Sequence, residues 1–476
     1  FAKNKVAMTK FSNFAMMESP NKESRNLKEL SEAPVGRLLW KYSLPAVVGM
    51  LVMSLYNIVD RIFIGQWVGP EAIAGLAITF PVMNLSAALG VLIGAGGSAR
   101  ISILLGAKDF KGAQSVLGNA LVLLSIIICC YLTCFAVFID DILVAFGASE
   151  VTLPYARELM LYILPGMFMT NFAFTFNNFM RASGYPVRAM VTMFIGAAVN
   201  LVLDPIFIYY FEWGIRGAAI ATDISMMVSA MFVMWHFFKP KSTLRFLPDK
   251  EMYRLSWRVV FPMLSIGAAP SLVNAASCFI NVIINKTLYV HGGDTAVAAA
   301  GIFTTYTSLM TMVVVGICQG MQPIIGYNYG AGTIHRLRRT YWLAVGVSTV
   351  IVATGQIIGL TIPHLIGRAF TTDPGLIAET SRCLHISMLA FTVVGFQIVS
   401  TTLFQSIGKA SASIFLSLTR QVLFLIPLLL LLPPKFGLDG IWAAFPTSDL
   451  IATLVTAIMV GWQLSRFRRI EGVSVA

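Results

Sequence analysis

Charged side chains are scarce in this sequence. Only 12% of the 476 residues are Asp, Glu, Lys or Arg, whereas a soluble globular domain has about 25%. Apolar residues make up 57% of the chain, and the mean hydropathy is +0.78. This composition excludes an ordinary soluble enzyme or binding domain. It predicts an all-α polytopic membrane protein, because lipid-exposed chain must satisfy its own backbone hydrogen bonds.

Motifs for metal, nucleotide or nucleophile chemistry are also lacking. The five histidines form no His-Glu-x-x-His pair, and the six cysteines lie in apolar segments without metal-ligand spacing. No Walker A or Gly-x-Ser-x-Gly run occurs. We therefore expect no cofactor and no enzyme activity. An intramembrane transferase is the alternative from another class, but its nearest motif, His291-Gly-Gly-Asp294, has the wrong spacing.

Long apolar segments are abundant instead. A segment of about 20 residues suffices to cross the hydrocarbon core, and we expect twelve such helices, six in each half of the chain. Their ranges are 37–66, 73–99, 113–139, 155–180, 188–211, 216–238, 257–289, 296–325, 339–364, 380–405, 410–433 and 439–464. The predicted domains are an N-terminal cytoplasmic tail (1–35), an N-terminal lobe (36–238), a cytoplasmic linker (239–256), a C-terminal lobe (257–465) and a C-terminal tail (466–476).

The basic residues are distributed unevenly along the chain. If the N-terminus and the even-to-odd loops share one side of the membrane, that side holds 26 of the 34 Lys and Arg residues. The positive-inside rule then places both termini in the cytoplasm. This asymmetry accounts for the net charge of +12 without a nucleic-acid partner. We expect a multi-pass protein of a bacterial or archaeal plasma membrane.

The two halves of the chain repeat each other. Gly106-Ala107 matches Gly330-Ala331, and Ala72-Ile-Ala-Gly-Leu-Ala-Ile matches Ala296-Val-Ala-Ala-Ala-Gly-Ile, both at an offset of 224 residues. Six helices return the chain to the same side, so the repeats are parallel. They predict two six-helix lobes related by a pseudo-twofold axis along the membrane normal, an arrangement that suits alternating access.

Two aspartates fall inside predicted helices of the first half. An ionised Asp costs about 2.5–3.5 kcal/mol at a helix centre on insertion scales, so an intramembrane acid indicates a proton or cation site. Asp60 and Asp204 lie about 9–10 Å below the outer ends of their helices at 1.5 Å per residue, and Thr222 lies at the same depth. Tyr56 and Asn200 lie one turn below the two acids. The alternatives are an Asp60–Arg61 ion pair or helix-end caps.

These segments resemble the multidrug and toxic compound extrusion (MATE) family over most of residues 36–465. The resemblance implies a V-shaped pair of lobes that exports organic cations in exchange for H⁺ or Na⁺. In the DinF-like branch it assigns cation coupling to Asp60, Asp204, Asn200, Tyr56 and Thr222; with Na⁺, Asp60 and Asp204 would be metal ligands. The motifs that carry it are Leu44-Pro45, Tyr56-Asn-Ile-Val-Asp60, Ala74-Gly-Leu-Ala77, Arg181-Ala-Ser-Gly184, Asn200-Leu-Val-Leu-Asp204-Pro205 and Gly330-Ala331.

One departure from the family pattern narrows the expectation. The NorM-like branch has acids in the seventh and tenth helices, but the seventh here carries only asparagines, including Asn285, and the tenth only Glu379 at its mouth. We therefore expect coupling in the N-terminal lobe alone. For Arg420 and Asp449 in the C-terminal lobe, a structural ion pair is favoured over a role in substrate selection. For Asp223 the two interpretations are equal.

Substrate contacts are harder to predict. The resemblance points to Asn177, and the eighth helix offers Met310, Gln319 and Gln322 as side chains that could face a cavity. The expected partners are small amphiphilic cationic drugs and the lipid bilayer, and we expect a monomer. A flippase or metabolite exporter of a related transporter fold is the alternative; a flippase would need a more basic cavity, for which Arg420 and Lys286 are candidates.

Overall fold

A computed structural model describes residues 25–475 except 68–69, 149 and 151. This part of the chain is mostly helical and contains no strand. The elements of the N-terminal lobe are α3 (Val35–Trp67), α4 (Pro70–Gly106), α5 (Phe110–Val137), α6 (Ile139–Ala145), α7 (Leu153–Ala182), α8 (Pro186–Pro205), the π-helix η1 (Ile206–Tyr210) and α9 (Gly214–Phe238). Those that follow are α10 (Lys250–Tyr253), α11 (Trp257–Gly330), α12 (Ile334–Thr361), α13 (Pro363–Phe370), α14 (Pro374–Ser387), α15 (Thr392–Ser406), α16 (Ala410–Leu418), the π-helix η2 (Thr419–Leu425), α17 (Ile426–Leu431) and α18 (Pro433–Val475).

The described helices make the twelve membrane crossings that the sequence predicts. Ten are long and apolar enough to span alone, and α14 with α15 forms an eleventh, bent by 59°. One of the ten, α11, has 74 residues and would be about 110 Å long if straight, far more than the bilayer thickness of about 30 Å. It reverses at Gly293, whose φ of 62° is non-helical, so α11 crosses twice.

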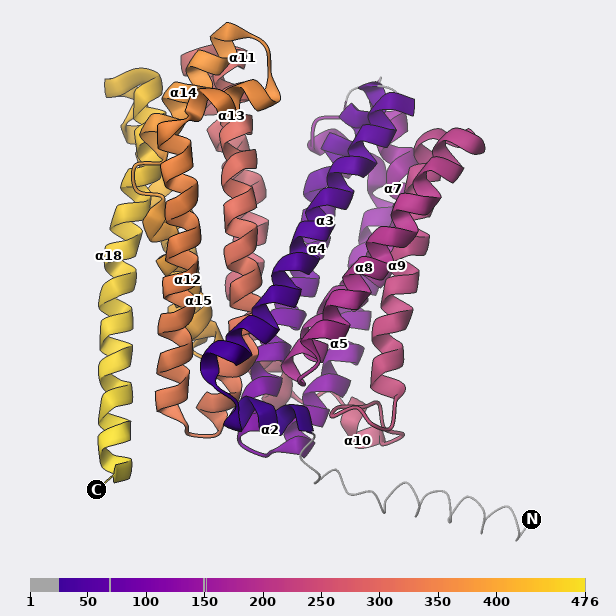
Figure 1. Ribbon diagram of the computed structural model, residues 1–476. Helices are drawn as coiled ribbons and strands as arrows, with labels where there is room; N and C mark the ends of the chain where they lie inside the picture. The colour runs from indigo at the N-terminus through magenta and orange to yellow at the C-terminus, as the bar shows by residue number, and fades with distance from the viewer. Residues whose placement is uncertain (1–24, 68–69, 149, 151, 476) are drawn as a thin grey trace, which may run out of the picture.

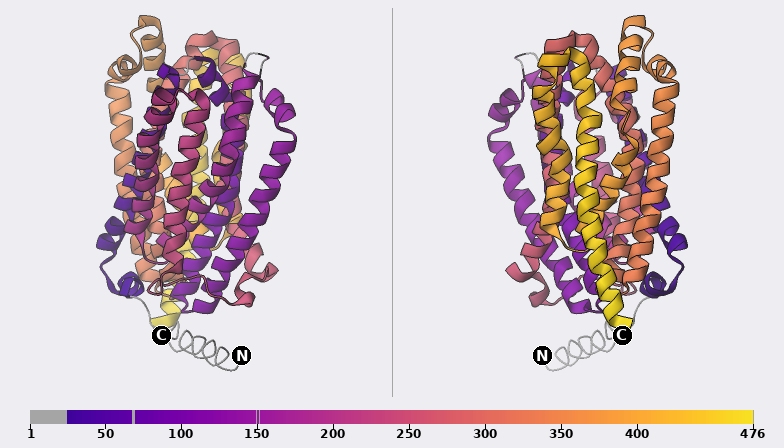
Figure 2. Two further views of the ribbon diagram at one scale, coloured as in Figure 1. Left: turned by 90° about the vertical axis from the view of Figure 1, so that its right-hand side faces the viewer. Right: turned by 90° about the vertical axis from the view of Figure 1, so that its left-hand side faces the viewer.

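The helices form two lobes arranged as a V (Figure 1). The N-terminal lobe comprises α3 to α9, and the C-terminal lobe comprises α11 to α18. In Figure 1 the lobes approach each other at the end that holds α2, α10 and the C-terminus, and they diverge toward the opposite end. Figure 2 shows the outer faces of the two lobes, with the helices upright in both views. The predicted fold class is therefore confirmed.

Paired glycines bring the lobes into contact at the converging end. Gly106 of α4 faces the carbonyl oxygen of Tyr327, and Gly330 of α11 faces that of Ile103. A Cβ atom at either glycine would stand 1.9 Å from that oxygen, so only glycine permits this approach. Both the glycines and their partners are 224 residues apart. The motif repeated in the sequence thus forms a symmetric crossing of α4 with α11.

Parts of both predicted tails are helical in the described residues. The expected tail 1–35 contains the helix α2 (Arg25–Glu32), and the expected tail 466–476 continues α18 to Val475. Leu27 and Leu30, three residues apart on one face of α2, are 0% exposed. The polar composition of the tail hid this apolar stripe, which is sufficient to bury one face of a short helix.

Candidate functional site

Three polar side chains of the N-terminal lobe meet where α8 packs against α9. The Asn200 Nδ2 atom donates to Asp204 Oδ1 at 3.1 Å and to Thr222 Oγ1 at 3.3 Å. Asn200 is 2% exposed and Asp204 is 1% exposed. Asn200 and Asp204 are four residues apart on α8, so they share one helix face, and Thr222 reaches them from α9. The predicted depth match between these helices is thus a direct contact.

The helix α3 adds a second carboxyl group to this cluster. The carboxyl groups of Asp60 and Asp204 lie close enough to interact with each other, and Tyr56 lies close enough to both carboxyls to interact electrostatically. Asp60 is half-buried. The side chain of Arg61, the alternative partner, lies outside the described residues. The structure therefore gathers all five residues predicted for cation coupling, from three helices of one lobe.

A break in regular helix accompanies this cluster. The helix α8 ends at Pro205, directly after Asp204, and continues as the π-helix η1. Pro205 has no N–H group, which leaves the carbonyl oxygen one turn earlier, at Leu201, without its usual helical donor. Short π-helices are frequent at functional sites. The second π-helix, η2, lies in the C-terminal lobe. It contributes to the only buried ion pair that the described residues of this lobe form.

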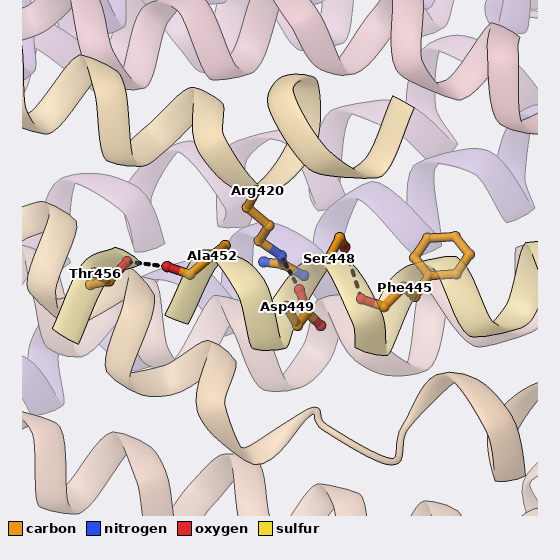
Figure 3. Close-up of polar contacts among 6 residues, drawn as sticks. All are labelled: Arg420, Phe445, Ser448, Asp449, Ala452 and Thr456. Carbon is orange, nitrogen blue, oxygen red and sulfur yellow. Dashed lines mark hydrogen bonds and ion pairs between the residues drawn. The ribbon is translucent and has the colours of Figure 1, made fainter. Parts of the chain in front are cut away.

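That ion pair joins Arg420 of η2 to Asp449 of α18. The Arg420 Nε atom donates to Asp449 Oδ1 at 2.6 Å, and Figure 3 shows the guanidinium pointing at the carboxylate. Asp449 is 3% exposed. The predicted structural pair therefore forms. Asp223, by contrast, packs against Gly166 of α7, one residue beyond Thr222 and beside the acidic cluster.

Two of the residues predicted to bind substrate make contacts inside their own lobe. Asn177 is 5% exposed, and its Nδ2 atom donates to Ala189 O at 2.7 Å and to the Thr192 hydroxyl. Met310 packs against Gly355 of α12. In this state both residues hold neighbouring helices together. A substrate contact, which stays a prediction, would require these interactions to open.

The other two residues predicted to bind substrate lie between the lobes. Gln319 Oε1 accepts from Arg181 of α7, and its Nε2 lies 3.8 Å from Met50 Sδ of α3. Gln322 is 8% exposed, and its Nε2 donates to Ala95 O of α4 at 3.2 Å. Both glutamines thus connect the C-terminal lobe to the N-terminal lobe. The sequence analysis used Arg181 only as part of a family motif, just after a helix expected to end at residue 180, whereas α7 continues to Ala182 and carries Arg181.

A cavity of about 390 Å³ lies elsewhere, at the bend between α14 and α15. Gln356, Thr392 and Thr447 supply its polar groups, while Leu389 and Leu450 belong to its apolar lining. No lining residue is titratable, and all of them lie in the C-terminal lobe. This cavity therefore lacks the acidic side chains that the cluster between α3 and α8 provides.

The acidic cluster contains only two carboxyl groups that could bind a metal ion, Asp60 and Asp204. Within the described part of the chain, no group of three His, Cys, Asp or Glu residues is arranged to hold a metal. Asp60 and Asp204 could serve a monovalent ion together with the neutral oxygens of Asn200 and Thr222. Such oxygen ligands suit hard cations.

Known proteins resemble this chain over most of its length. The profile of the MatE family matches residues 45–206 and 269–431. The multidrug export protein MepA of Staphylococcus aureus (strain MRSA252) is 28% identical over 92% of this chain and 96% of its own length. The FAD transporter of Shewanella oneidensis is 28% identical over 89% and 93%. A solved outward-facing conformation of a multidrug resistance MATE family transporter is 25% identical, with a TM-score of 0.87 over 95% of this chain and all of that one.

Proposed function

Since the chain belongs to the MatE family, we propose that it is a secondary-active multidrug exporter that exchanges organic cations for H⁺ or Na⁺. The observation that supports this is the approach of Asp60 to Asp204 beside Asn200 and Thr222. Its relatives are transporters, and nothing in its motifs indicates catalysis. We propose that the inward and outward states alternate by rocking of the two lobes.

The carboxyl pair can exist in two charge states. A hydrogen bond between two carboxyl groups requires one of them to be protonated, because a carboxylate has no hydrogen to donate. When both are ionised, their charges repel in a low-dielectric site until a cation lies between them. Proton loss or Na⁺ exchange would thus change the packing of α3 against α8. Pro45 within α3 is the place where that helix could bend in response.

Amide substitutions test the coupling role of the acids. We expect Asp60→Asn and Asp204→Asn each to reduce export of ethidium to the background of vesicles without the protein, since neither can release a proton. Fluorescence in everted vesicles under an imposed pH or Na⁺ gradient measures this and separates the two ions. Asp140→Asn is the matched control, because Asp140 of α6 forms a half-exposed ion pair with Arg157 of α7. Parental export by both site variants would refute the assignment.

A metabolite exporter is the second candidate. The similarity to the FAD transporter of Shewanella oneidensis favours it, because that relative covers the chain almost as fully as MepA does. The two candidates differ in the charge of the exported molecule. Export of ethidium but no flavin nucleotide from loaded everted vesicles would support the first candidate, and the reverse result the second.

We also propose a plasma-membrane location with both termini in the cytoplasm, and a monomer as the working unit. The distribution of Lys and Arg supports the orientation. The end of the molecule that holds α2 and the C-terminus (Figure 1) would then be cytoplasmic. With that orientation the V opens to the outside.

A further inference from the structure

A guanidinium group is buried between the lobes without an acidic partner. Arg181, at the end of α7, is 4% exposed. Its Nη2 atom donates to Asn178 Oδ1 at 2.8 Å, and its Nη1 atom donates to Gln319 Oε1 of the other lobe. Both acceptors are neutral amides, and Arg181 takes part in none of the ion pairs among the described residues. A buried ion without an opposite charge is costly.

The fold itself does not require a positive charge at this place. The fourth helix of each lobe is followed by a glycine with positive φ, 99° at Gly184 and 77° at Gly408, and these are 224 residues apart. At the same offset, Arg181 corresponds to Gln405, which is 7% exposed. The equivalent position of the C-terminal lobe is therefore filled by a neutral side chain. The charge of Arg181 needs an explanation other than helix packing.

Arg181 is also separated from the acidic cluster along the transport axis. Its partner Gln319 contacts Met50, which precedes Asp60 by ten residues on α3. Ten residues of helix span about 15 Å, so the guanidinium lies well toward the converging end of the lobes. Gln319 is itself only half-buried. Separation of the lobes at this end would remove one acceptor and expose the guanidinium to molecules arriving there.

We propose that Arg181 binds a carboxylate or phosphate group of the exported molecule on its way in from the converging end, and that Gln319 replaces this group when the lobes close. The inference rests on the second candidate function, the metabolite exporter, and adds a substrate class to it: molecules that carry an anionic group. A planar guanidinium fits both anions through paired hydrogen bonds. When the anion leaves, the amide of Gln319 keeps one N–H group satisfied.

Flavin mononucleotide and riboflavin test this site, because they differ by one phosphate. Fluorescence titration of the purified protein in detergent is expected to show at least about tenfold tighter binding of flavin mononucleotide, as charge-assisted hydrogen bonds contribute more than neutral ones. Arg181→Gln, which reproduces the residue of the other lobe, should bind both flavins equally. Arg181→Lys should retain part of the preference. No preference in the parent, or an unchanged preference in Arg181→Gln, overturns the proposal.

Gln319→Ala distinguishes anion binding from a purely mechanical role. It removes the hydrogen bond between the lobes and keeps the charge, so the preference for flavin mononucleotide should persist. If Gln319→Ala and Arg181→Gln instead weakened both flavins alike, Arg181 would only hold the lobes together, and the proposal would be wrong. The ethidium assay on Asp60→Asn and Asp204→Asn tests the export function independently of the flavin titrations. Failure of one proposal is therefore distinguishable from failure of the other.

A lipid headgroup carries the same phosphate chemistry as a soluble substrate. Titration in nanodiscs of phosphatidylcholine, with and without phosphatidylglycerol, separates the two sources. If the anionic lipid leaves binding of flavin mononucleotide to the parent unchanged, the soluble anion is the occupant. Suppression that depends on Arg181 identifies the headgroup as a competing ligand of the same site.

Discussion

Buried charges are compensated differently in the two lobes. In the C-terminal lobe, Arg420 and Asp449 neutralise each other at 2.6 Å. In the N-terminal lobe, Asp204 instead interacts with another acid, Asp60. An opposite-charge pair is stable as it stands, whereas a pair of acids must hold a proton or a cation. This difference at the residue scale supports coupling in the N-terminal lobe.

Removal of one member of the C-terminal pair should destabilise the protein. Arg420→Ala leaves Asp449 buried and unpaired, which typically costs about 3–5 kcal/mol. The double variant Arg420→Met/Asp449→Leu removes both charges and should lie within about 1–2 kcal/mol of the parent. Thermal unfolding of the purified variants in one detergent measures this. Equal stability of parent and Arg420→Ala would show that the pair is solvated.

At the scale of elements, the close crossing of α4 and α11 limits how the lobes can pack. Gly106→Ala places a Cβ atom where the Tyr327 carbonyl oxygen lies, so the two helices must separate. We expect a loss of about 1–3 kcal/mol from overpacking and a sharp fall in ethidium export. A cysteine introduced by Ala107→Cys should be labelled faster by a thiol reagent in the Gly106→Ala variant than in the parent.

Gly301→Ala is the matched control for this crossing. Gly301 also lies in α11, but a Cβ atom there would contact nothing within 4 Å. Helix propensity alone predicts a small gain for this change, up to about 1 kcal/mol. Equal effects of the two substitutions on export would mean that the α4–α11 contact has no role in closing the lobes.

At the scale of the whole molecule, charge distribution determines the orientation in the membrane. The N-terminus and the even-to-odd loops hold 26 of the 34 Lys and Arg residues, and α2, α10 and the C-terminus lie together at one end of the molecule (Figure 1). We expect a C-terminal green fluorescent protein fusion to fluoresce and a C-terminal alkaline phosphatase fusion to be inactive, as cytoplasmic ends require. The opposite pattern would mean that the two lobes diverge toward the cytoplasm, contrary to the proposal.

The size of the working unit is a further prediction at this scale. If the monomer is the functional form, light scattering of the detergent-solubilised protein should give a protein mass near 51.9 kDa. Export activity should not depend on protein density in vesicles. A stable mass of twice this value would contradict the prediction.

The sequence by itself determined the fold class, the number of crossings and the members of the acidic cluster. Apolar segments, the 224-residue repeat and the expense of an intramembrane acid are local or periodic signals, so they can be read without coordinates. It also marked Gly106 and Gly330, although not what they approach. Their partner carbonyls belong to the other lobe.

Tertiary structure alone decided which polar residues face the other lobe. In the sequence, Gln319, Gln322 and Asn177 are all single polar residues in or beside apolar helices. In the structure, the two glutamines form hydrogen bonds to the N-terminal lobe, whereas Asn177 forms hydrogen bonds within its own lobe. Likewise, the partner of Arg181 is Gln319, a neutral residue 138 positions away in the chain. Such contacts depend on how two lobes meet, and no periodicity along one helix records that geometry.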